Sequence, residues 1–130
     1  MLYPRWLRLA PAAVALWVAA SWPIGLAVDP GRLKRPGEVA YLLADVGILL
    51  PLAIAAAVAL HRRSPSSRGL LATMLGALAY DATHFGVRTM QELSITGARL
   101  AVSAGLLLLL VAIGVGLHIL LGTPRPPAST

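Results

Sequence analysis

Three ionisable side chains lie close together in an otherwise apolar part of the chain: Asp81, His84 and Arg88. Their spacing of three and then four residues places them on one face of a helix. An aspartate and a histidine on one face can exchange a proton near neutral pH or hold a cation. The same groups also suit acid–base chemistry on a lipid-soluble substrate. The pattern therefore predicts a polar stripe with a binding or catalytic role.

A second stripe with the same spacing contains Glu38, Tyr41 and Asp45. If the two helices are antiparallel, Asp45 and Asp81 each lie about 10 Å from the same membrane surface, at 1.5 Å per residue. We therefore expect Asp45, Asp81 and His84 to form one polar pocket inside the membrane. The residues expected to bind a proton, a cation or a small lipophilic ligand are Asp45, Asp81, His84, Tyr41, Tyr80, Arg88, Glu38 and Trp22.

The free-energy cost of a membrane-embedded acid supports a role for this pocket. An ionised aspartate at the centre of a spanning helix costs about 2.5–3.5 kcal/mol. Such a residue must be paired, face water or a ligand, or carry a proton. We expect Asp45 and Asp81 to share a proton. The alternative is structural, because Asp45 could bond Tyr80 or Thr83 and only join two helices.

Pro51 lies six residues after Asp45 and is expected to interrupt the helix there. Proline has no backbone N–H, so the carbonyl of Gly47 loses its normal partner. A broken helix beside an acid can help to bind a cation or a polar ligand. A plain kink, which is common in membrane helices, is the alternative interpretation.

The elements that position these residues follow from the composition. The chain has 130 residues, of which 58% are hydrophobic and 12% are charged, whereas soluble domains average about 25% charged residues. This composition indicates an integral membrane protein with the lipid bilayer as its partner. Four apolar segments are of spanning length, and they cover about residues 9–28, 39–60, 69–90 and 100–121. We predict an all-α, four-helix transmembrane bundle with antiparallel neighbours.

The domain organisation is predicted to be simple. Residues 1–122 form a single transmembrane domain, and the Pro-rich tail 123–130 is expected to be disordered. The first segment is read as a retained helix, because its apolar core is longer than that of a signal peptide. Both termini and the middle connector are predicted to be cytoplasmic, because their side has more arginines. These arginines are Arg5, Arg8, Arg62, Arg63, Arg68 and Arg125.

Several functional classes are excluded or left open. The net charge of +6 is spread over connectors and chain ends, which does not suit a nucleic-acid interface. The absence of cysteine excludes thiol and disulfide chemistry. His61 and His118 are expected to be solvated, so no cofactor and no metal are predicted.

A ligand-binding or transport protein is the first interpretation. An accessory or structural subunit of a larger membrane complex is the second, and a membrane enzyme is the third. The partners left open are a second copy of the chain, in a homo-oligomer, or a larger membrane complex.

Overall fold

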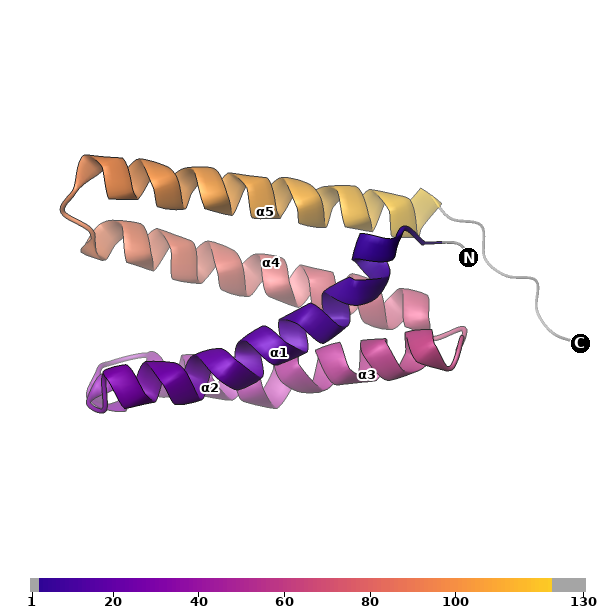
Figure 1. Cartoon of the computed structure of the whole chain (residues 1–130), viewed down its shortest axis with the longest axis horizontal. Helices are drawn as coiled ribbons and strands as arrows, with labels where there is room; N and C mark the ends of the chain where they lie inside the picture. Colours follow the sequence, from indigo (N-terminus) through magenta and orange to yellow (C-terminus); the bar gives the residue numbers. More distant parts are fainter. Residues whose placement is uncertain (1–2, 123–130) are drawn as a thin grey trace, which may run out of the picture. The chain divides into compact units, whose positions relative to one another are not determined.

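The structure is a computed structural model that describes residues 3–122, and all regular structure in this range is helical. The predicted all-α class is therefore confirmed. The elements along the chain are α1 (Arg5–Val28), the 3-10 turn η1 (Arg32–Lys34), α2 (Glu38–Ala44), the π-helical turn η2 (Asp45–Leu49), α3 (Leu50–His61), α4 (Ser67–Glu92) and α5 (Thr96–Gly122) (Figure 1). Because α2, η2 and α3 follow without a break, they form one helix, Glu38–His61.

Each predicted apolar segment lies inside one of four long helices, which extend beyond it by up to four residues. Within the described residues, three helices are long and apolar enough to cross a membrane: Arg5–Val28, Glu38–His61 and Thr96–Gly122. The fourth, α4, has spanning length but more polar residues, including Asp81 and His84. The structure thus supports three spanning helices by length and composition.

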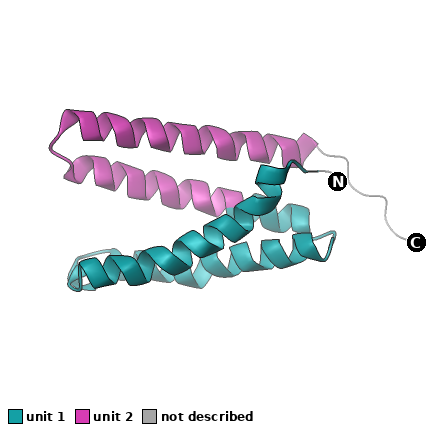
Figure 2. Cartoon of the chain, in the orientation of Figure 1, with its two compact units in different colours: residues 1–74 teal, residues 75–130 magenta. Residues whose placement is uncertain are grey.

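The chain divides into two compact units, residues 1–74 and residues 75–130 (Figure 2). The division falls inside α4, so the first turns of this helix belong to unit 1 and the remainder to unit 2. The predicted single domain and the disordered tail stay predictions, and the tail lies outside the described residues.

In unit 1, α1 packs against the helix that contains η2 and α3 (Figure 1). The buried residues of α1 recur every three or four positions and form one stripe: Leu7, Pro11, Val14, Val18 and Trp22. The facing helix buries Asp45, Leu49, Ala53, Ala56 and Ala59. Since alanine side chains are small, they allow two helices to approach closely. The contact between the two helices therefore consists of small apolar residues near the end of α3, whereas at η2 it includes the polar residue Asp45.

The interruption expected at Pro51 takes the form of the π-helical turn η2. Proline cannot donate the hydrogen bond that would continue the helix. The preceding turn is wider than an α-helical one, and the backbone N–H of Leu50 donates to the carbonyl oxygen of Asp45, five residues earlier. Single π-turns inside α-helices are rare and frequently occur at functional sites. This one begins at Asp45.

Unit 2 contains the rest of α4 and all of α5, which run antiparallel and are joined by residues 93–95 (Figure 1). Gly86 is buried, and a Cβ atom there would lie 2.8 Å from the Cδ2 atom of Leu106, so the two helices are in close contact. Most of α5 is apolar and exposed, including Leu107, Leu108 and Val111. A helix that is apolar all round is typical of a membrane span.

Candidate functional site

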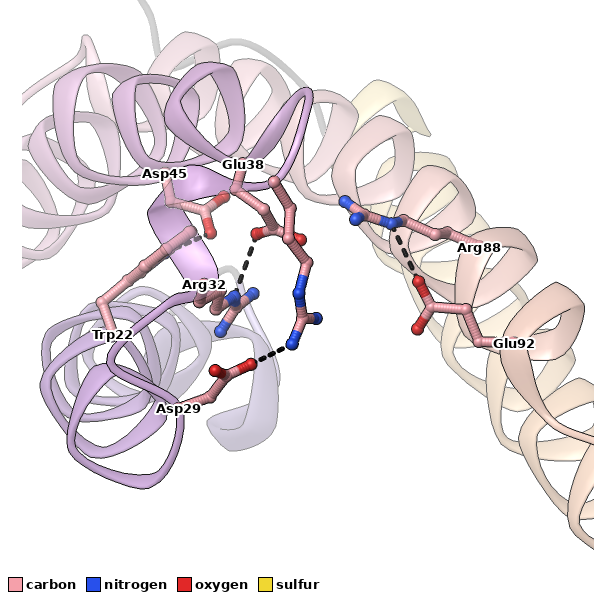
Figure 3. A network of polar contacts seen from close by, with 8 residues as sticks. Trp22, Asp29, Arg32, Glu38, Asp45, Arg88 and Glu92 are labelled. Carbon is pink, nitrogen blue, oxygen red and sulfur yellow. Dashed lines mark hydrogen bonds and ion pairs between the residues drawn. The ribbon is translucent and has the colours of Figure 1, made fainter.

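Asp45 forms a buried hydrogen bond with Trp22 inside unit 1. The indole Nε1 of Trp22 donates to Oδ2 of Asp45 at 2.7 Å (Figure 3). Asp45 is 8% exposed and Trp22 is 5% exposed. An indole has one N–H donor and no acceptor, so this bond satisfies the tryptophan completely. It also connects α1 to η2, although the two residues are 23 positions apart.

The second carboxylate oxygen of Asp45 has a different environment. Oδ1 is buried and accepts no hydrogen bond from any of residues 3–122. A buried charged acceptor without a donor is costly, because it has lost its water without gaining a protein partner. The charged form of Asp45 is therefore only half satisfied by the protein.

Arg32 packs on the face of Trp22 and forms an ion pair with Glu38. Its Cζ atom lies 4.3 Å from the centroid of the indole ring. Its Nε atom donates to Oε2 of Glu38 at 2.9 Å (Figure 3). Glu38 is 4% exposed, so its charge is neutralised inside the protein. Trp22 is thus hydrogen-bonded to one buried acid, Asp45, and linked to a second, Glu38, through the guanidinium group of Arg32.

Gly25 makes room for this arrangement. It lies three residues after Trp22 on α1 and therefore shares its face of the helix. A Cβ atom at Gly25 would lie 2.8 Å from the Nη1 atom of Arg32. Any side chain at this position would push the guanidinium group away from its place on the indole. The glycine is needed here for close approach rather than for an unusual backbone conformation.

A second ion pair lies at the same end of unit 1, between Arg35 and Asp29. Both side chains are largely exposed, at 53% and 39%. An exposed pair of this kind contributes about 0–1 kcal/mol. Together with the Arg32–Glu38 pair, it balances most of the charge carried by the connector between α1 and α2.

Four other residues predicted for the site lie on α4. Asp81 is half-buried on α4, and Tyr80 and His84 are exposed, with their rings stacked at a centroid distance of 6.2 Å. Arg88 pairs with Glu92 one turn along α4, at 3.3 Å between Nε and Oε1. These residues belong to unit 2, whereas Asp45 belongs to unit 1. The pocket expected to contain both aspartates therefore stays a prediction.

In unit 1, Glu38, Tyr41 and Asp45 all lie on an inward face: Tyr41 is half-buried and the two acids are buried. The sequence interpretation left out the basic partners in the connector, Arg32 and Arg35. One signal for them was available, because Arg32 and Arg35 lie between Asp29 and Glu38, and the four residues follow one another at intervals of three. The contribution of Gly25 had no comparable signal.

Within the described range, no group of three or more His, Asp or Glu side chains is arranged to hold a metal ion. The fold and the site thus define an all-helical protein with three helices suited to a membrane and a buried Trp–Asp pair beside a π-turn. Comparison of the chain with protein-family models, with curated proteins and with solved structures finds no match.

Proposed function

We propose that this chain is a small integral membrane protein with four spanning helices that binds a proton at Asp45. One observation carries the proposal: Asp45 is buried, one of its oxygens accepts a hydrogen bond from Trp22, and the other accepts none from residues 3–122. Intramembrane acids without full compensation commonly mark proton or ion pathways. The π-turn that begins at Asp45 adds support, because such turns concentrate at functional sites.

A proton fits this site better than the other ligands expected from the sequence. Oδ1 is enclosed by protein atoms, so a metal cation or a lipophilic molecule would need the helices to move apart. Hard cations also require several oxygen ligands, about six for magnesium and six to eight for calcium. A proton requires one oxygen and no additional space. Use of the bound proton for transport stays a prediction.

Trp22 provides a direct readout of the protonation state of Asp45. Trp6→Phe and Trp17→Phe together leave Trp22 as the one tryptophan of the chain. The fluorescence of this variant, reconstituted in liposomes, is recorded while the pH is varied. Because the indole donates to the carboxyl group, we expect its emission to change as Asp45 gains or loses a proton. Infrared spectra should show the carbonyl band of a protonated carboxylic acid over the same pH interval.

Asp45→Asn in the same background is the matched control. The amide oxygen can still accept the indole bond but the side chain does not titrate, so both pH-dependent signals should disappear while the helices remain folded. If the fluorescence and infrared changes persist in Asp45→Asn, the proton is bound elsewhere and the proposal is wrong. The same liposomes, loaded with a pH-sensitive dye, test whether proton flux depends on Asp45.

The proposal includes a crossing of the membrane by α4, with both termini in the cytoplasm. Its 26 residues correspond to a length of about 39 Å, which exceeds the hydrocarbon core of about 30 Å. Ser66 and Ser94 lie just outside its two ends and are both exposed. Single cysteines at these positions should react from opposite sides, with Ser94→Cys labelled by an impermeant reagent added outside intact cells. Labelling of both positions from one side would show that α4 does not span.

A further inference from the structure

One end of unit 1 is basic and contains no acid. In the sequence, Asp and Glu are absent before Asp29 and between positions 46 and 74. The connector after α3 carries Arg62 and Arg63, and both side chains are exposed. Because α1 runs antiparallel to α3, the first turn of α1 lies at this same end and adds Arg5. Positive charge at this end is therefore not balanced by acids of unit 1.

Arg63 occupies a backbone position that favours glycine. Its φ is 54°, and it is the one non-glycine residue of the described chain with positive φ. It ends α3 in a Schellman motif: the N–H of Arg63 donates to the Leu60 carbonyl at 3.1 Å, and the N–H of Ser64 donates to the Ala59 carbonyl at 2.8 Å. Glycine is the usual residue at this point of the motif. The chain thus carries an arginine here against the local backbone preference.

The connector is held in a defined conformation next to an apolar span. The N–H of Ser66 donates to Oγ of Ser64, and the N–H of Ser67 donates to the Ser64 carbonyl. Trp6 lies in the first turn of α1 and is 45% exposed. Tryptophan beside basic residues at the end of a span is typical of the headgroup region of a bilayer. The exposed Trp6 and the arginines at this end are therefore the residue types expected at the level of the lipid phosphates.

We propose that Arg62 and Arg63, together with Arg5, form a binding surface for anionic phospholipid headgroups. The match between this surface and an anionic headgroup rests on charge, because exposed guanidinium groups bind phosphate oxygens through paired hydrogen bonds. It also rests on location, because basic residues at the end of a span attract the anionic lipids of that surface. The inference does not depend on proton binding at Asp45.

The experiment uses the full chain purified in a mild detergent and titrated with short-chain phosphatidylglycerol, with phosphatidylcholine, and with inorganic phosphate. Native mass spectrometry reports the bound lipid, and thermal unfolding reports stability. We expect phosphatidylglycerol to bind more tightly than the other two ligands. Arg63→Gly should weaken the binding of phosphatidylglycerol about fivefold, because this is the contribution expected from one basic residue near a membrane surface. The same variant should unfold at an equal or higher temperature, because glycine suits the positive φ.

Two further variants complete the test. Arg62→Gln should weaken phosphatidylglycerol binding to a similar extent without any change in backbone conformation. Lys34→Gln removes one exposed positive charge from the opposite end of unit 1 and should leave the affinity unchanged. Equal binding of the two lipids, or equal losses in Arg63→Gly and Lys34→Gln, would overturn the proposal. Inorganic phosphate binding as tightly as phosphatidylglycerol would also overturn it, since the site would then recognise free phosphate rather than lipid.

Discussion

The two ends of unit 1 differ in how their charged side chains are neutralised. At the end formed by η1 and the start of α2, Arg32 pairs with buried Glu38, and Arg35 pairs with Asp29. At the other end, Arg62 and Arg63 are exposed and the surrounding sequence contains no acid. Charge is therefore neutralised inside the chain at the first end, whereas the second end depends on its surroundings.

This difference separates residues that hold the fold together from residues that bind an external surface. Removing one member of a buried pair leaves its partner desolvated and unsatisfied, which destabilises the folded state. Removing an exposed charge changes stability by a few tenths of a kcal/mol at most. Variants at the paired end should therefore lower stability, and variants at the basic end should change lipid binding while stability stays the same or rises.

The largest loss of stability is expected for Trp22→Phe. An aromatic ring is kept, but the N–H is lost, so neither oxygen of Asp45 has a donor among the described residues. Leaving a buried charged acceptor unsatisfied should lower the free energy of unfolding by about 2–3 kcal/mol. Unfolding with sodium dodecyl sulfate in mixed micelles measures the change. Trp17→Phe, at an exposed position of the same helix, should be nearly neutral, and equal losses in the two variants would contradict the importance of the Trp22–Asp45 bond.

Glu38→Gln should have the next largest effect. It keeps the size of the side chain but leaves Arg32 without its anionic partner, in a side chain that is 23% exposed. Fully buried pairs cost about 3–5 kcal/mol when one partner is removed, and partial exposure of Arg32 reduces the expected loss to about 1–2 kcal/mol. Asp29→Asn breaks the exposed pair with Arg35 and serves as the comparison, with an expected loss of 1 kcal/mol or less. A loss in Glu38→Gln no larger than in Asp29→Asn would show that burial does not strengthen the Arg32–Glu38 pair.

Much of the helical architecture could be predicted from the sequence, because apolar segments of spanning length leave few alternatives to helices. The four segments were placed to within a few residues of the observed helices. The interruption before Pro51 was also predictable, since a missing N–H must disturb the hydrogen bonds of the helix. Its form, a π-turn that begins at Asp45, depends on how the whole turn relaxes, and the proline alone does not specify this.

The partners of the candidate site were harder to predict. Helical spacing relates residues on one helix, so it placed Glu38, Tyr41 and Asp45 on one stripe. It does not relate Trp22 to Asp45, which lie on different helices. The two positions meet because of the rotation of α1 about its axis and the conformation of the connector. Arg32 reaches Trp22 for the same reason, since η1 turns the chain back over the end of α1.

The smallest change in stability is expected for Gly25→Ala, because two opposing effects nearly cancel. Replacing glycine by alanine inside a helix raises the free energy of unfolding by up to about 1 kcal/mol. The new Cβ atom, however, would lie 2.8 Å from Nη1 of Arg32 and would displace the guanidinium group from the indole. The loss of this cation–π attraction lowers the free energy of unfolding by about 0.5–1 kcal/mol. The emission of Trp22 should nevertheless shift in the variant with a single tryptophan, because the cation leaves the ring. Arg32→Gln provides the control background. There, Gly25→Ala has no guanidinium group to displace, so it should stabilise the protein by its full helix preference and leave the emission unchanged. If Gly25→Ala had the same effect on stability and emission in both backgrounds, the guanidinium group of Arg32 would not pack on the indole of Trp22. Gly25 would then not be needed to make room for this contact.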